Sequence, residues 1–127
     1  MKSNNLVSII MTCNNGESFL QEAVESIINQ TYPNWELIFY DNYSNDKSEK
    51  IIKNYKDKRI KYFRLNKLVN LGTIRKLAYS KCQGFFISFL DVDDYWSSYK
   101  LEKQIKRFEI NDNIDVVYSN YYKIKDH

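Results

Sequence analysis

Three aspartates follow the most hydrophobic segment of this 127-residue chain. The run 85–90, FFISFL, leads directly into Asp91, Asp93 and Asp94. Carboxylates crowded in one place repel one another unless a cation or a network of donors compensates. A hard divalent ion with oxygen ligands, Mg²⁺ or Mn²⁺, would do so, and it commonly shares its site with substrate phosphates. The alternative is a polar loop in which Asp93 or Asp94 caps a helix and the other acids are solvated.

The apolar run before these acids is too short for a helix. A continuous apolar segment behind Gly84 predicts a strand buried on both faces, as in the centre of a parallel sheet. Ligands of such sheets bind outside the carboxyl ends of the strands. If the chain stays extended beyond Leu90, Asp91 and Asp93 project to the same side. The acids are therefore expected at the ligand-binding edge of a sheet.

The composition is that of one globular domain. Hydrophobic residues make up 43% of the chain, and the net charge is only +3, with no basic patch of the kind that binds nucleic acid. Cys13 and Cys82 have no CxxC spacing, and we expect buried free thiols in a reducing compartment. The sequence has no signal-peptide pattern and no apolar run near the roughly 20 residues that span a bilayer. These features predict a cytoplasmic protein.

Strand and helix patterns alternate along the chain. Strands are predicted over 6–11, 35–40, 60–65, 85–90 and 115–119, with a sixth beginning within 121–124, and helices over 19–28, 46–55, 71–81 and 98–110. Asp46, followed three residues later by Glu49, resembles a capping box. The alternation predicts an α/β fold, a three-layer α/β/α sandwich with a mostly parallel sheet. Polar residues interleave the strand 60–65, which is typical of an edge strand.

Every polar cluster of interest comes directly after a predicted strand. The clusters are Thr12–Gly16, Asp41–Asp46, Asn66–Gly72 and Asp91–Asp94. Because the carboxyl ends of parallel strands meet at one edge, the sequence predicts a joint site there. Arg75, near the start of the helix after Gly72, either faces solvent or holds a diphosphate bidentately. Trp96 is either a core aromatic or a wall of that site.

With these pieces in order, the sequence resembles the family-2 inverting glycosyltransferases, which have the GT-A fold and use nucleotide-diphosphate sugars. The matching pieces are VSIIMTCNN, FLQEAVESIINQTYPNWELIFYDNYSND, IIKNYKDKRIKYFRLN, LGTIRKLAYSKCQG, FFISFLDVDDYW, KLEKQI and DVVYSNYY. They cover nearly the whole chain. The resemblance implies metal-dependent transfer of a sugar with inversion, and bacterial members commonly build surface or cell-envelope polysaccharides.

By this resemblance, the turns after the first two strands flank the nucleobase through Thr12, Asn14, Asp41 and Asn42. Asn14 stands where the family usually has Tyr, and Thr12 where it usually has Pro. Asn42 stands where a second Asp commonly meets the base, which leaves base selectivity open.

The resemblance also gives roles to the arginine and the acids. Arg75 corresponds to the arginine that reaches the nucleotide. Asp91-Val92-Asp93 is similar to the DXD motif, with Asp91 near the ribose or phosphate and Asp93 on the metal, Mg²⁺ or Mn²⁺. Lys76 and Ser98 depart from the family's common Asn and Pro.

In the family, the acceptor-binding half follows the fifth strand and carries the catalytic base. This chain stops at His127, before that region, so residues 1–127 are expected to form a single nucleotide-sugar-binding domain without the base. The implied partners are a nucleotide-diphosphate sugar and a glycan or lipid-linked acceptor. Peripheral membrane association through the missing segments, and a homodimer, are left open.

Two other functions are considered. One is a catalytically incomplete binding or assembly module of the same fold, which recruits a partner through exposed apolar surface. The other is a different enzyme on a similar sheet, such as a nucleotidyltransferase or a phospho-receiver domain. A receiver needs its acceptor Asp after the third strand, where this chain reads Leu65-Asn66-Lys67.

Overall fold

The structure is a computed structural model that describes residues 5–125. Strands and helices alternate in the order β1 (Val7–Cys13), α1 (Leu20–Ile28), β2 (Trp35–Asp41), α2 (Ser48–Asn54), β3 (Ile60–Arg64), α3 (Leu71–Tyr79), β4 (Phe86–Phe89) and α4 (Lys100–Ile110). The strands form one sheet in the order β3-β2-β1-β4, and all neighbours are parallel. The predicted α/β alternation and the edge position of β3 are confirmed.

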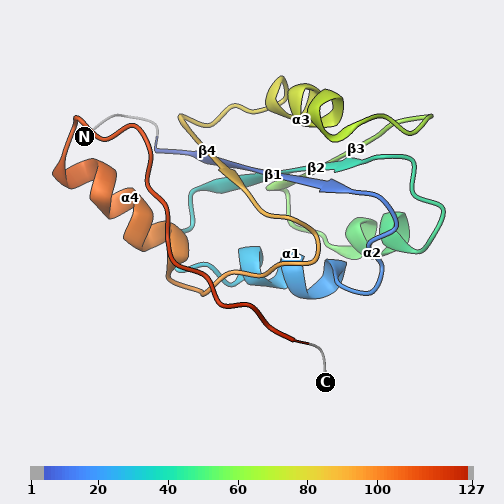
Figure 1. The fold of residues 1–127 in the computed structure, drawn as a ribbon, viewed down its shortest axis with the longest axis horizontal. Coiled ribbons are helices and arrows are strands. Elements are labelled where there is room, and N and C mark those ends of the chain that lie inside the picture. Colours follow the sequence, from blue (N-terminus) through green and yellow to red (C-terminus); the bar gives the residue numbers. More distant parts are fainter. Residues whose placement is uncertain (1–4, 126–127) are drawn as a thin grey trace.

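Helices cover both faces of this sheet, which makes three layers (Figure 1). Side chains of α1, α2 and α4 pack with Ile9 and Met11 of β1 on one face. On the other face, Ile10 packs with Ile74 and Ala78 of α3. Neighbouring residues of a strand point to opposite faces, so the continuous apolar run of β1 supplies both layers. Each fully buried aliphatic side chain contributes about 1.5–3 kcal/mol.

The centre of the sheet is formed by β1 and β2. Every residue of β2 is buried, and so is every residue of β1 except the half-buried Thr12. The two strands are in register along their whole length, with Val7 opposite Trp35 and Cys13 opposite Asp41. The two strands therefore end at the same level, and the turns that follow them begin side by side.

The prediction that β4 is a central strand buried on both faces is wrong. Within residues 5–125, β4 pairs only with β1, and Phe89 is 53% exposed. Phe86 does pack against Phe108 of α4, with ring centroids 4.7 Å apart. The apolar run indicated that this strand has material to bury, but hydrophobicity carries no information about which strand lies beside it.

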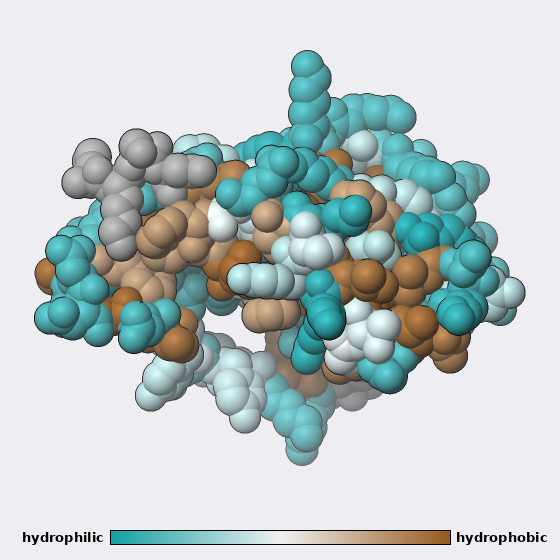
Figure 2. Space-filling model, turned by 90° about the horizontal axis from the view of Figure 1, so that it is seen from above, coloured by the Kyte–Doolittle hydropathy of each residue, from teal (hydrophilic) through white to brown (hydrophobic). Residues whose placement is uncertain are grey.

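The predicted fifth and sixth strands are not formed. Residues 111–125 contain no helix or strand, and Val116, Tyr118, Tyr121 and Tyr122 are 76–95% exposed. A strand needs a neighbouring backbone to satisfy its N–H and C=O groups, and this segment stands away from the free edge of β4. A cavity of about 770 Å³, lined by Phe85, Phe86, Phe108, Ile114 and their neighbours, lies between the two. Seen from the α3 side, an opening separates this segment from the body of the molecule (Figure 2).

Two smaller observations complete the fold. The predicted capping box is not formed. Lys47 is the N-cap of α2 and makes no side-chain cap hydrogen bond, Asp46 accepts from the Ser48 N–H at 2.9 Å, and Glu49 binds Lys53 and Arg64 instead of the backbone. No helix among residues 5–125 is long and apolar enough to cross a membrane.

Candidate functional site at the carboxyl edge of the sheet

The four predicted polar clusters lie at one edge of the sheet, as expected. Because all four strands are parallel, the turns after Cys13, Asp41, Arg64 and Phe89 leave the sheet on the same side. Ile10 and Tyr40 face α3, so Thr12 and Asn42, two residues further along, face α3 as well. The structure therefore brings residues of β1, β2 and α3 to one face of this edge.

Arg75 joins this face from α3. Its Nη2 lies 3.2 Å from Asp91 Oδ1, and its guanidinium lies 5.6 Å from the centroid of the Phe89 ring. Both partners of the ion pair are exposed, so the pair itself contributes only about 0–1 kcal/mol to stability. The contact shows that Arg75 and Asp91 lie next to each other at the edge of the sheet.

The acids form a turn instead of an extended segment. Asp94 donates its backbone N–H to the Asp91 carbonyl at 3.0 Å, so the condition for Asp91 and Asp93 to project together from an extended strand is not met. All three carboxylates remain exposed. Burial and then the charges of Asp93 and Asp91 raise the pKa of Asp94. The neighbouring carboxylates thus disfavour the charged form of Asp94, and a bound cation would offset this effect.

These oxygen donors fit Mg²⁺ or Mn²⁺ in part. Among residues 5–125, no group of three or more His, Cys, Asp or Glu side chains is arranged ready to hold a metal ion. Such ions commonly take one or two carboxylates from the protein and the remaining ligands from water and substrate phosphates. Exposed carboxylates on a turn suit that arrangement and do not suit a closed all-protein site.

Val92 anchors the acidic turn, and sequence analysis missed this. It packs with the core on the α1 side of the sheet. A Cβ built on Gly16 would lie 2.7 Å from Val92 Cγ2 and 2.9 Å from Cys13 Sγ. Only glycine leaves room for the acidic turn to rest on the turn after β1. The signal in the sequence was a lone glycine in a polar turn, and a glycine there commonly serves the turn itself.

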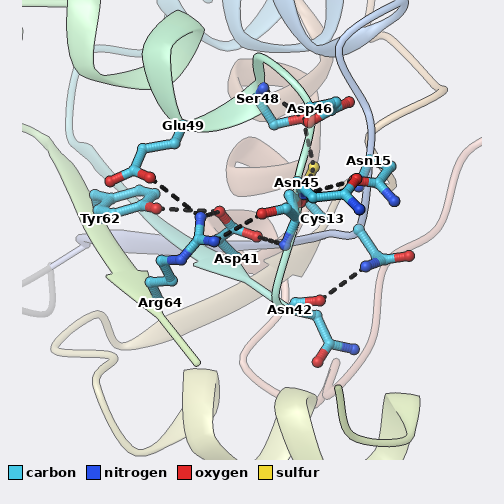
Figure 3. A network of polar contacts seen from close by, with 12 residues as sticks. Cys13, Asn15, Asp41, Asn42, Asn45, Asp46, Ser48, Glu49, Tyr62 and Arg64 are labelled. Carbon is cyan, nitrogen blue, oxygen red and sulfur yellow. Dashed lines mark hydrogen bonds and ion pairs between the residues drawn. The ribbon is translucent and has the colours of Figure 1, made fainter. Parts of the chain in front are cut away.

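Asp41 points away from the α3 face into a closed network (Figure 3). It is fully buried and accepts hydrogen bonds from the Ser44 N–H at 2.8 Å, the Tyr62 hydroxyl at 3.0 Å and Arg64 Nη1 at 2.9 Å. Arg64 also donates to the Ser44 carbonyl at 2.7 Å. Burial, with the nearby charge of Asp41, raises the pKa of Tyr62 to about 12. The carboxylate thus holds the turn after β2 and is surrounded by protein groups.

The turn after β1 is tied to the turn after β2 by polar contacts. Asn15 donates its N–H to Ser44 Oγ, and its side-chain oxygen accepts from the Asn45 N–H, both at 2.9 Å. Asn15 has a φ of 55°, a conformation that asparagine tolerates better than most residues. Gly16 donates its N–H to Ser48 Oγ at 3.0 Å, next to the buried Cys13. These contacts consequently join the two turns where they meet.

The amides on the α3 face are also engaged. Asn14 is exposed and donates from Nδ2 to the Asn42 carbonyl at 2.8 Å. Asn42 is 8% exposed and exchanges two hydrogen bonds with the backbone of Val69. Of the two roles considered for Trp96, the structure supports that of a core aromatic, because its side chain packs against the hydrophobic cluster on the α1 side. Lys100 Nζ lies 3.9 Å from the centroid of its ring.

This geometry can be compared with known proteins. The sequence profile of the family described as Glycosyl transferase family 2 matches residues 8–127. The chain belongs to this family. An uncharacterized glycosyltransferase of Haemophilus influenzae is 41% identical over 118 residues, which cover 91% of this chain and 47% of that protein. The Escherichia coli protein WfgD, named UDP-Glc:alpha-D-GlcNAc-diphosphoundecaprenol beta-1,3-glucosyltransferase, is 38% identical over 116 residues, covering 91% of this chain and 46% of WfgD.

The solved structures agree on the fold of this family 2 chain. Staphylococcus aureus TarS 1–349 in complex with UDP-GlcNAc superimposes with a TM-score of 0.79 at 26% identity, covering 82% of this chain and 31% of that one. The GT-A fold expected from the sequence is thus confirmed for the described part. This chain spans less than half the length of the curated relatives named above.

Proposed function

We propose that this chain is the donor-binding part of a family 2 glycosyltransferase. It binds a nucleotide-diphosphate sugar at the carboxyl edge of the sheet, and the sugar is transferred with inversion to a glycan or lipid-linked acceptor in cell-envelope polysaccharide synthesis. The observation that carries this proposal is the meeting of Arg75 with Asp91 on the face that Thr12 and Asn42 share. A guanidinium that can bind an anion lies next to a carboxylate that can bind a cation, and this pair suits a diphosphate with its metal ion.

In this proposal, the nucleoside lies over the turns after β1 and β2, near Thr12 and Asn14. Asp41 contributes by holding the second turn in shape, since its carboxylate is enclosed by Ser44, Tyr62 and Arg64. WfgD is named for a UDP-glucose donor and the TarS structure contains UDP-GlcNAc, so uridine nucleotides are the first candidates to test.

The diphosphate lies between Arg75 and the acidic turn. Arg75 would donate to the diphosphate oxygens in place of its ion pair with Asp91, and Asp91 and Asp93 would then be free to hold Mg²⁺ or Mn²⁺. When bound, the ion stabilises the charge that develops on the departing diphosphate. The acceptor hydroxyl needs a general base, which typically contributes about 10²–10⁴-fold. No residue among those matched here takes that role.

Calorimetric titration of UDP-glucose and UDP-GlcNAc, with and without Mn²⁺, tests the proposal. We expect binding that requires the metal, and a dissociation constant raised at least tenfold by Asp93→Asn, about 1.4 kcal/mol. Asp112→Asn, an exposed acid beyond α4, is the control and should bind as the wild type does. Equal binding with and without Mn²⁺, or no binding of any nucleotide sugar, would contradict the proposal.

The exposed aromatic residues of 116–124 favour the assembly module as a second candidate. Such a module self-associates or recruits a partner through this surface. Its mass in solution, measured at several concentrations, should rise with concentration, and a strict monomer would argue against it.

A further inference from the structure

Asn42 makes a two-way contact with the backbone of another loop. Its Nδ2 donates to the Val69 carbonyl at 2.8 Å, and its Oδ1 accepts from the Val69 N–H at 3.0 Å. The side chain therefore pairs with Val69 as a neighbouring strand would. The orientation of the amide follows from its partners. In the opposite orientation, the NH₂ group would face the Val69 N–H and the amide oxygen would face the Val69 carbonyl.

At a pH where a carboxyl would be ionised, this contact requires an amide. An ionised aspartate in its place could accept from the Val69 N–H, but its second oxygen would face the Val69 carbonyl without a proton between them. With only 8% of Asn42 exposed, water has little access to relieve that repulsion. The chemistry thus explains why this position carries Asn, although the family resemblance would place Asp there.

Val69 leads directly to the start of α3. Asn70 caps this helix by accepting the Thr73 N–H at 2.9 Å, and Arg75 follows within the second turn. At the other end of the same loop, Leu65 donates its N–H to the Asp41 carbonyl at 2.9 Å. The loop from β3 to α3 is therefore fastened to the end of β2 at both of its ends.

We propose that Asn42 is a positioning residue, which fixes the loop 65–70 and thereby the start of α3 that carries Arg75. It does so instead of reading the nucleobase. The inference rests on the proposed function, since Arg75 is taken to bind the diphosphate. It implies that the identity of residue 42 alters the affinity for every nucleotide diphosphate by the same factor.

The test compares the wild type with Asn42→Asp by hydrogen exchange of the free protein, followed at residues 65–73. We expect exchange in Asn42→Asp to be roughly tenfold faster at pH 7, since one buried hydrogen bond is lost and a repulsion is added. The control is Asn66→Asp, which adds the same charge to an exposed position of this loop and should exchange as the wild type does. Unchanged exchange in Asn42→Asp would overturn the proposal.

Acid should restore the contact in the Asn42→Asp variant. Once protonated, the carboxyl introduced at position 42 could donate to the Val69 carbonyl and accept from its N–H, as the amide does. Burial raises the pKa of such a carboxyl, so the difference from the wild type should shrink as the pH falls from 7 toward 5. A difference that stays constant over this range would count against the two-way contact.

Titration with UDP and GDP separates this proposal from the proposed function. We expect Asn42→Asp to weaken both nucleotides by an equal factor, roughly tenfold. Tighter binding of UDP alone would show that residue 42 reads the base and would overturn the inference. If the wild type binds neither nucleotide, the proposed function fails, while the exchange experiment still decides whether Asn42 holds the loop.

Discussion

Replacing Asp41 with asparagine would test whether this carboxylate supports the structure or contacts a ligand. Asp41 accepts hydrogen bonds from three donors, the Ser44 N–H, the Tyr62 hydroxyl and Arg64 Nη1. An amide at position 41 has one oxygen, so in either orientation its NH₂ group faces at least one of these donors. The substitution also removes the charge that pairs with Arg64.

The expected cost follows from the burial of each partner. Breaking a buried ion pair by removing one side costs about 3–5 kcal/mol. The Arg64 side chain is 34% exposed, so water can take over part of its hydrogen bonding, and we expect a smaller loss of about 2–4 kcal/mol. That is a large share of the roughly 5–15 kcal/mol by which domains are stable.

Urea denaturation followed by circular dichroism would measure this loss. Tyr62→Phe removes one of the three donors and should cost about 1 kcal/mol. Together with Asp41→Asn it completes a double-mutant cycle, in which we expect a coupling of about 0.5–3 kcal/mol. Asp115→Asn, an exposed acid outside the helices and strands, is the matched control.

One result would refute this reasoning. Suppose that the free energy of unfolding of Asp41→Asn lies within about 0.5 kcal/mol of the wild-type value, as for an ordinary surface substitution, and that the variant nevertheless loses nucleotide binding. The carboxylate would then contact the ligand and would not serve the structure.

Three further predictions concern stability. The pKa of Tyr62 is raised from 10.0 to about 12, so the wild type should lose stability as the pH rises between those values. In urea titrations at alkaline pH, this loss should be about 1–2 kcal/mol larger for the wild type than for Tyr62→Phe. A Cβ on Gly84 would lie 2.6 Å from the Leu6 carbonyl oxygen and the Ser8 nitrogen, so Gly84→Ala should lower the melting temperature markedly. Its control Gly72→Ala, with only a 3.5 Å contact to Asn70, should stabilise α3 by up to about 1 kcal/mol. Burial lowers the pKa of Lys100 from 10.5 to about 8, so Lys100→Met should be more stable than the wild type by about 1 kcal/mol at pH 7. This gain should shrink as the pH rises from about 8 and disappear above about 10.5, where the lysine is neutral in both the folded and the unfolded state, and a gain that stays equal across this range would contradict the burial argument.

The alternation of elements and the shared edge of four turns could be predicted from the sequence, because both follow from periodicity and chain order. The meeting of Arg75 with the acids was also within reach, since parallel topology leaves few places for them. The position of β4 was not, because Phe89 is apolar whether or not a neighbour covers it. The enclosure of Asp41 was not either, since β2 is apolar on both faces and its pattern does not indicate where the last residue points.

The alternation of side chains at the strand ends explains how this edge combines rigidity with an open site. On β1, Cys13 packs on the α1 side and Thr12 faces α3, and after β4 the same holds for Val92 and Asp91.

At the end of β2, Asp41 is enclosed by Ser44, Tyr62 and Arg64, while Asn42 reaches across to Val69 on the α3 side. Each of these strand ends thus supplies one residue that anchors its turn and a neighbouring residue that lies on the α3 face, where the nucleotide sugar is proposed to bind. Substitutions of the first kind should change the free energy of unfolding before they change binding. Substitutions of exposed residues of the second kind, Asp91 above all, should do the reverse, because an exposed side chain contributes little to stability, and the Asp91 carboxylate can bind the metal ion that accompanies a diphosphate.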